Sequence, residues 1–136
     1  MRSKLSQTLL FSTLALIPLF HARVVEAETE KWEAPAEESA KPNPFAGAAD
    51  ARTAGEKVYA KRCAGCHGDT GDGDGPDAAD LGIHPAKLSQ MNPAEESDGA
   101  LFWKIQTGKK PMPKYGAKLT PDEIWQVIVY VRSFRK

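Results

Sequence analysis

The sequence predicts an all-α domain of three or four helices, and three observations support this fold class. Residues 120–131 place apolar side chains at the helical spacing i, i+3, i+4 and i+7. Two further segments, at residues 53–63 and 97–108, begin with residues typical of a helix N-cap. No stretch alternates apolar and polar residues convincingly, as a half-buried strand would. At 136 residues, the chain is expected to form one domain.

The first 27 residues predict a secretory signal peptide. Arg2 and Lys4 give it a basic start, and an apolar core follows at residues 8–20. Val25 and Ala27 are small residues at positions −3 and −1 of a cleavage site. The alternative is a retained membrane anchor, but an apolar stretch of 13 residues falls short of the ~20 that a membrane span needs. We therefore expect an exported, periplasmic protein whose mature form has no membrane span.

Residues 28–49 are rich in Ala, Pro and Glu and lack a sustained apolar period. This composition predicts a flexible N-terminal extension. Trp32 and Phe45 are its large side chains, and either could lie on the folded domain. The domain itself is expected to span residues 50–136. A domain of this size gains stability from a covalent cross-link or a bound metal.

The first helix of this domain is expected to begin at Thr53 and to end near Cys63. Thr53 and Glu56 have the spacing of a capping box, in which each side chain satisfies a backbone N–H at the helix start. Val58 and Tyr59 are expected among its buried positions. The helix should then end at residues 63–67, the most informative segment of the sequence.

The remaining chain is expected to combine irregular loops with two helices. Gly71, Gly73 and Gly75 predict a turn-rich loop over residues 68–76, and two prolines keep residues 84–93 irregular. Ser97 and Gly108 are the expected N-cap and C-terminal stop of the next helix.

Residues 120–123 (TPDE) begin the last helix and combine an N-cap, a proline at the first helical position and a capping-box carboxylate. The apolar face of this last helix is Ile124, Val127, Ile128 and Val131.

Residues 63–67 read Cys-Ala-Gly-Cys-His, the most specific motif in the chain. Two thiols three positions apart, followed directly by a histidine, form the attachment pattern of a c-type haem. Cys63 and Cys66 would each form a thioether to one vinyl group, and His67 would supply the proximal iron ligand. A half zinc site and a thioredoxin-like pair are disfavoured, since there is no third cysteine and no βαβ pattern. A plain disulfide is the remaining alternative in an exported protein.

The candidates for the second axial ligand are Met91, Met112 and His84. Met112 is favoured because prolines on both sides hold the backbone extended, on a polar, Lys-rich loop rather than in a core. Met91 is expected to pack in the irregular segment, and His84 to lie in a loop. An open coordination site is the other possibility.

The charge of the chain excludes a general nucleic-acid binder. Removing residues 1–27 takes away three basic residues and one acidic residue, which leaves 15 basic and 17 acidic residues and a formal charge of −2. A nucleic-acid binder would carry a strong basic excess. The charges are also segregated, because residues 69–80 contain five aspartates and no basic residue. No register of this run fits an EF-hand, so we interpret it as a solvated turn.

Five lysines and no acidic residue lie between positions 99 and 121. Such a cluster either forms an ordinary solvated surface or steers an acidic partner toward a site. Because it brackets Met112, we expect it to serve as a docking surface. The lysines are Lys104, Lys109, Lys110, Lys114 and Lys118.

Residues 50–136 resemble a class I cytochrome c. The resemblance rests on the order of Gly55 and Tyr59, the 63–67 motif, Gly75-Pro76, the Pro-Met112-Pro loop and the closing helix. It implies the cytochrome c fold, with three to four helices around one covalently attached haem and with crossed N- and C-terminal helices. Gly55 and Tyr59 would pack on Val127 and Tyr130 at this crossing.

The resemblance also implies roles around the iron. His67 and Met112 would be its axial ligands. Pro76 would accept the hydrogen bond from the other ring nitrogen of His67 and so fix its orientation, with Pro85 as the alternative acceptor. The glycine-rich loop and the extension are most similar to small monohaem cytochromes of the bacterial periplasm.

These expectations favour a one-electron carrier, not an enzyme, that binds one haem c with its iron. It would act as a monomer or as a subunit of a redox complex, between respiratory or dehydrogenase and reductase partners with an acidic docking face. One alternative is a haem enzyme or ligand sensor in which Met112 is a loose ligand or none. The other is a thiol protein that uses Cys63 and Cys66 as a redox pair.

Overall fold

The structure, a computed structural model, describes residues 31–135, and the predicted signal peptide lies outside them. Within this range no helix is long and apolar enough to cross a membrane. The described residues contain no strand, only an isolated bridge between Lys109 and Met112. The α-helices are α1 (Ala36–Ser39), α2 (Ala49–Arg62), α3 (Ala64–His67), α4 (Asp98–Thr107) and α5 (Pro121–Arg132), with short 3-10 helices η1 (Ala78–Leu81) and η2 (Leu88–Gln90).

The two C-terminal helices begin as the sequence predicts. At α5, the Glu123 N–H donates to Thr120 Oγ1 at 3.2 Å and the Thr120 N–H donates to the Glu123 carboxylate at 2.8 Å, which completes the capping box. At α4, the Ala100 N–H donates to the Ser97 hydroxyl at 3.2 Å. Gly108 then ends α4 with a φ of +60°, a conformation that favours glycine.

The predicted start of the first long helix is wrong. α2 begins at Ala49, four residues before Thr53, so Thr53 lies inside the helix and its hydroxyl donates to the Ala49 carbonyl at 3.4 Å. The Asp50 side chain accepts from the Ala51 N–H at 3.0 Å and satisfies one of the unpaired donors of the first turn. The capping-box spacing at Thr53 is therefore not used.

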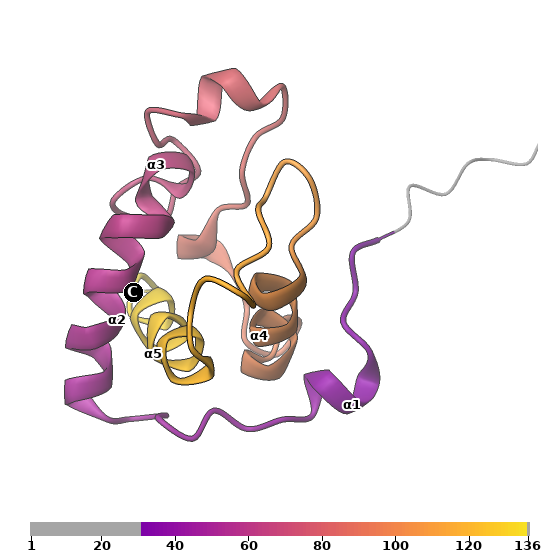
Figure 1. Cartoon of the computed structure of the whole chain (residues 1–136), viewed down its shortest axis with the longest axis vertical. Helices are drawn as coiled ribbons and strands as arrows, with labels where there is room; N and C mark the ends of the chain where they lie inside the picture. The colour runs from indigo at the N-terminus through magenta and orange to yellow at the C-terminus, as the bar shows by residue number, and fades with distance from the viewer. Residues whose placement is uncertain (1–30, 136) are drawn as a thin grey trace, which may run out of the picture. The chain divides into compact units, whose positions relative to one another are not determined.

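α2 and α5 cross in close contact, with α5 between α2 and α4 (Figure 1). A Cβ atom on Gly55 would lie 2.0 Å from the Gln126 carbonyl oxygen and 3.0 Å from the Val127 Cα, so only glycine allows this approach. One turn later, the ring centroids of Tyr59 and Tyr130 lie 5.4 Å apart. The crossed helices expected from the resemblance are confirmed.

α5 supplies buried residues to both parts of the core. On one side Val127 and Val131 pack with Tyr59 of α2. On the other side Ile124, Trp125 and Ile128 pack with α4. The rings of Phe102 and Trp125 stack there with centroids 4.2 Å apart. α5 thus anchors α2 and α4 to one another.

The N-terminal extension differs from the flexible segment that its composition predicts. In residues 31–48, α1 contacts α4, and the Ser39 carbonyl accepts from the Ser97 hydroxyl at 2.7 Å. Asn43 is buried, and its Nδ2 donates to the Trp125 carbonyl at 3.1 Å. Phe45 packs against the core shared by α4 and α5. This part of the extension belongs to the folded unit.

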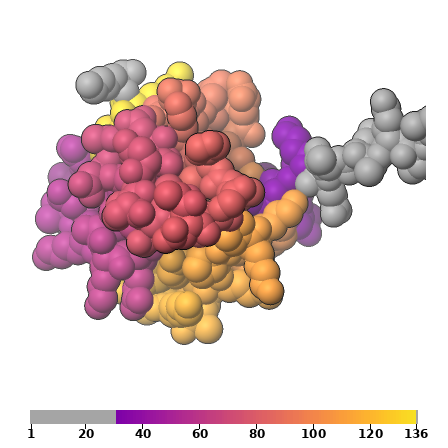
Figure 2. All heavy atoms as spheres, turned by 90° about the horizontal axis from the view of Figure 1, so that it is seen from above, coloured from indigo at the N-terminus to yellow at the C-terminus, as the bar shows by residue number. Residues whose placement is uncertain are grey.

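Residues 68–90, which follow α3, form a loop that returns to the core. The Tyr59 hydroxyl donates to the Gly68 carbonyl at 2.7 Å, and the Asp72 carboxylate accepts from the hydroxyls of Thr70 (2.7 Å) and Ser89 (2.5 Å). Figure 2 shows this segment, in rose to salmon, beside the orange segment around residues 108–118 on one face of the domain. Both segments line one cavity, described next.

Candidate haem-binding site

The Cys-x-x-Cys-His segment lies at the junction of two helices. α2 ends at Arg62, Cys63 forms the junction, and the single turn of α3 runs from Ala64 to His67. The Cys63 carbonyl accepts from the N–H groups of Cys66 (3.2 Å) and His67 (2.9 Å), which closes this turn. As a result, Cys63, Cys66 and His67 line the same cavity.

This cavity has a volume of about 420 Å³. Its apolar walls come from three helices: Tyr59 of α2, Leu101 and Ile105 of α4, and Val127 and Val131 of α5. A flat apolar cofactor buried here would remove further apolar surface from water. Because two thiols and an imidazole open into an apolar pocket, the residues present fit a c-type haem.

The imidazole of His67 is oriented by a backbone carbonyl. Its Nδ1 lies 3.1 Å from the Ala86 oxygen, and because a carbonyl can only accept, Nδ1 carries the proton. Nε2 then keeps a lone pair for a metal ion. Burial lowers the pKa of His67, while the hydrogen bond to Ala86 opposes this shift. The imidazole is therefore neutral at pH 7, which is the state that binds metals.

The acceptor for His67 is not the predicted one. Pro76 is exposed, and the carbonyl that meets the imidazole belongs to Ala86, which directly follows the alternative Pro85. Backbone N–H groups on either side of Pro76 donate to carbonyl oxygens of α3 at 3.2 and 2.8 Å. These bonds tie the first turn of the loop to the α3 backbone, and the later part of the loop reaches the ring.

The two cysteines are free thiols with partly buried side chains. Burial, with a smaller contribution from the charge of Cys66, raises the pKa of the Cys63 thiol to about 12. A redox-active pair needs a thiol of low pKa, because the thiolate is the nucleophile. The surroundings of Cys63 therefore do not suit a thioredoxin-like pair.

Comparison with known proteins agrees with this geometry. The family model for "Cytochrome C oxidase, cbb3-type, subunit III" matches residues 50–131. The chain belongs to the c-type cytochrome family. It is 32% identical to cytochrome c6 of Pyropia tenera over 79 residues, which cover 58% of this chain and 87% of that protein. Cytochrome c6 of Parathermosynechococcus lividus is 31% identical over 77 residues, 57% of this chain and 83% of the relative.

Solved structures of c-type cytochromes share the fold. The KustC0563 c-type cytochrome matches with a TM-score of 0.52 and 31% identity, over 60% of this chain and 98% of that one. Cytochrome cL from Hyphomicrobium denitrificans matches with a TM-score of 0.57 and 26% identity, over 76% and 64% of the two chains. The predicted all-α cytochrome c fold is confirmed, and the cofactor of this domain is haem c with its iron.

All three candidates for the second axial ligand line the cavity of this cytochrome: Met91, Met112 and His84. Met91 also packs against the core formed by α4 and α5, and His84 is exposed. Met112 is half-buried on a loop that Tyr115 fixes in place. The Tyr115 N–H donates to a carbonyl of α4 at 3.1 Å, and its hydroxyl donates to a carbonyl of α2 at 2.8 Å.

The five predicted docking lysines do not share one environment. Lys109 and Lys110 are exposed and line the cavity, whereas Lys114 and Lys118 are exposed outside its lining. Lys104 also lines the cavity, but it forms an ion pair with Glu96 and its side chain is only 15% exposed. We therefore remove Lys104 from the predicted docking surface.

Sequence reasoning assigned neither Ala86 nor Glu96 to the cavity, and it left open whether Trp32 lies on the folded domain. Ala86 contributes only its backbone, which no side-chain pattern can reveal. Glu96 lies in a polar run before α4, where a carboxylate usually faces water. Trp32 did carry a signal, since a large aromatic side chain in a polar extension often marks a contact with the folded domain.

Proposed function

We propose that this cytochrome is a one-electron carrier with a single haem c. The haem is attached through Cys63 and Cys66, and its iron is ligated by His67 and Met112. The observation that carries the proposal is that these four side chains open into one apolar cavity. The neutral, carbonyl-oriented imidazole of His67 supports its role as the proximal ligand.

The bound haem would supply one-electron chemistry at its iron. The protein's part is to hold that iron in one coordination state. The Ala86 carbonyl keeps the His67 ring in one orientation, and Tyr115 fixes the loop that carries Met112. The apolar walls exclude water, which favours the less charged reduced state. With His67 and Met112 both holding the iron, a substrate would find no open position at it.

The cellular setting is proposed on the same basis. Residues 1–27 direct export to the periplasm, and the mature protein exchanges electrons there with redox proteins that present an acidic docking face. Lys109 and Lys110 at the cavity support this choice of partner, because exposed positive charge beside a redox centre attracts negative surfaces. The carrier would act as a monomer or as a subunit of a redox complex.

The ligand assignment is tested by replacing Met112 and Met91 separately with Ala. In the ferric holoprotein, Met112→Ala should abolish the weak far-red band of methionine–iron ligation and allow carbon monoxide to bind the reduced form. Met91→Ala is the matched control, because it also removes a thioether that lines the cavity. It should keep the band and lose only stability.

The opposite assignment of the two variants would make Met91 the ligand. A high-spin spectrum in the parent protein would instead support a haem enzyme or ligand sensor. Attachment is checked in the same samples: acid-acetone should leave the colour on the protein, and the mass should rise by one haem. Extractable haem would contradict the roles of Cys63 and Cys66.

A further inference from the structure

The segment of residues 31–41 contributes to the haem cavity although it precedes the family match at residues 50–131. Its anchor is a close backbone contact: a Cβ atom on Gly99 would lie 2.1 Å from the Glu38 carbonyl oxygen. The Ser97 hydroxyl donates to Ser39 in the same region. From this anchor the chain places Trp32 in the lining of the cavity.

Trp32 meets an ion pair at this side of the cavity. The Lys104 ammonium pairs with the Glu96 carboxylate and lies 5.5 Å from the centroid of the Trp32 ring. The two charged side chains are only 15% and 23% exposed. Arg132 holds the backbone of this region in place, since its Nη2 donates to the Glu96 carbonyl and its Nε donates to Asp98 at 2.8 Å.

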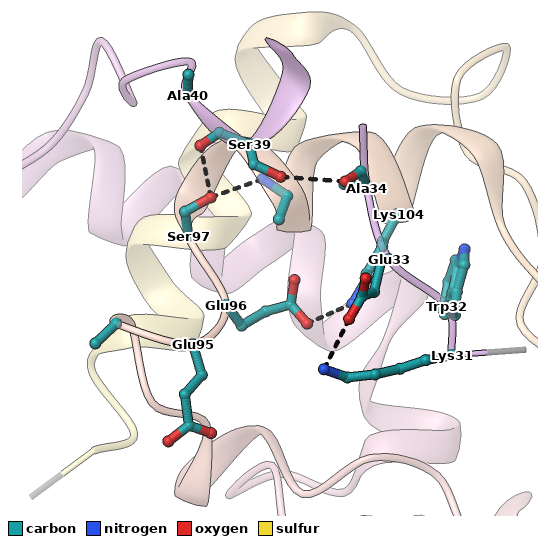
Figure 3. Close-up of a pocket in the computed structure, with 12 residues that line it drawn as sticks. Lys31, Trp32, Glu33, Ala34, Ser39, Ala40, Glu95, Glu96, Ser97 and Lys104 are labelled. Atoms are coloured by element: carbon teal, nitrogen blue, oxygen red, sulfur yellow. Dashed lines mark hydrogen bonds and ion pairs between the residues drawn. The ribbon is translucent and has the colours of Figure 1, made fainter. Parts of the chain in front are cut away.

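A second cavity is also lined by Trp32, Glu96 and Lys104. It has a volume of about 480 Å³, and Lys31 and Glu33 are among its polar lining residues. Figure 3 shows the Lys31–Glu33 pair beside the Lys104–Glu96 pair, with Trp32 next to them. Trp32, Glu96 and Lys104 line both cavities, so the outer cavity and the haem cavity adjoin at these three residues.

We propose that Trp32, Glu96 and Lys104 form a partition that keeps water in the outer cavity away from the haem and sets the local charge that the haem experiences. The N-terminal segment is then a determinant of the reduction potential. The inference rests on the haem site proposed above.

Two physical effects give the partition its influence. A charge with little exposure to water acts over a longer range than an exposed one, because water screens it less. Removing the Glu96 charge leaves Lys104 unbalanced, and a positive charge near the iron favours the ferrous state. Removing the Trp32 ring admits water, which favours the more highly charged ferric state and screens the ion pair.

The test is a potentiometric titration of the holoprotein in four variants: Glu96→Gln, Glu33→Gln, Trp32→Ala and the double variant Trp32→Ala/Glu96→Gln. Glu33→Gln is the matched control, because it removes the same charge from a side chain of the outer cavity that is 65% exposed. Far-UV circular dichroism and the far-red band verify that each variant keeps its fold and ligands.

We expect Glu96→Gln to raise the ratio of ferrous to ferric protein at the parent's midpoint at least threefold, which is about 30 mV for one electron. Glu33→Gln should change the ratio less than twofold. Trp32→Ala should lower the ratio, and Glu96→Gln should have a smaller effect in the Trp32→Ala background than in the parent.

Equal shifts for Glu96→Gln and Glu33→Gln would overturn the partition, as would an undiminished Glu96→Gln effect in the Trp32→Ala background. If Trp32→Ala does not fold, Trp32→Phe replaces it. Because the Phe ring would still cover the Lys104–Glu96 pair, the ratio of ferrous to ferric protein should then equal that of the parent. These outcomes leave the electron carrier intact. A parent protein without covalent haem would instead contradict the proposed function.

Discussion

Gly55→Ala tests the helix crossing on which the haem cavity depends. A Cβ atom at this position would lie 2.0 Å from the Gln126 carbonyl oxygen and 2.6 Å from its carbon. Real Cβ atoms essentially never approach another atom closer than 3.0 Å. The atoms in the way belong to the α5 backbone, which cannot rotate aside. α2 and α5 would therefore have to separate by about 1 Å.

The cost of this separation can be estimated from general magnitudes. A gap of ~0.5–1 Å removes a quarter to a half of the dispersion energy between facing atoms. Overpacking of a well-filled core costs about 1–3 kcal/mol, and a backbone clash belongs at the upper end of that range. The better helix propensity of Ala returns about 1 kcal/mol. We expect a net loss of about 2 kcal/mol in the free energy of unfolding.

The assay is thermal and denaturant unfolding of the holoprotein, followed by circular dichroism. For a domain near 100 residues, a loss of about 2 kcal/mol lowers the melting temperature by about 8–16 °C. Glu56→Ala, on an exposed position of the same helix, should stay within about 0.5 kcal/mol of the parent. A Gly55→Ala variant as stable as the parent, or more stable, would refute the close crossing. Its stability would then reflect only the higher helix propensity of Ala.

Two further predictions follow from the described contacts. Tyr59→Phe removes the 2.7 Å hydrogen bond to the Gly68 carbonyl, which still accepts from the Gly71 N–H at 3.2 Å. The free energy of unfolding should therefore fall by about 1 kcal/mol. A Tyr59→Phe variant as stable as the parent would show that the hydrogen bond contributes nothing to stability. Lys109→Glu/Lys110→Glu should slow electron transfer to an acidic redox partner several-fold at ~10 mM salt and little at ~500 mM. Lys57→Glu on α2 is the control, and equal slowing by it would exclude a specific docking surface.

Sequence reasoning succeeded where short-range chemistry decides the structure. The start of α5 depends on Thr120 and Glu123, which lie three residues apart and satisfy each other's backbone. The 63–67 motif is equally local, because one helical turn carries both thiols and the imidazole into the same cavity. The contact of Gly55 with α5 followed only from the resemblance, since no local rule pairs residues so distant in sequence.

Local rules failed where two of them competed. Thr53 and Glu56 have the spacing of a capping box, but the preceding alanines and Asp50 can already form a helical turn. Adding a turn gains backbone hydrogen bonds and brings Asp50 to the positive end of the helix dipole. A capping pattern marks a possible start, and the helix begins earlier when the residues before it are also good helix formers.

The remaining errors concern interactions of the backbone with distant residues. The acceptor for His67 is a carbonyl that any residue at position 86 would supply, so its side chain leaves no signature. The N-terminal extension is held in the same way, through the carbonyls of Glu38 and Ser39 against α4 and its N-cap. Low apolar content shows that a segment cannot form a core of its own. It does not show whether a neighbouring helix with a small residue such as Gly99 will accept that backbone, and here this contact brings Trp32 to the haem cavity.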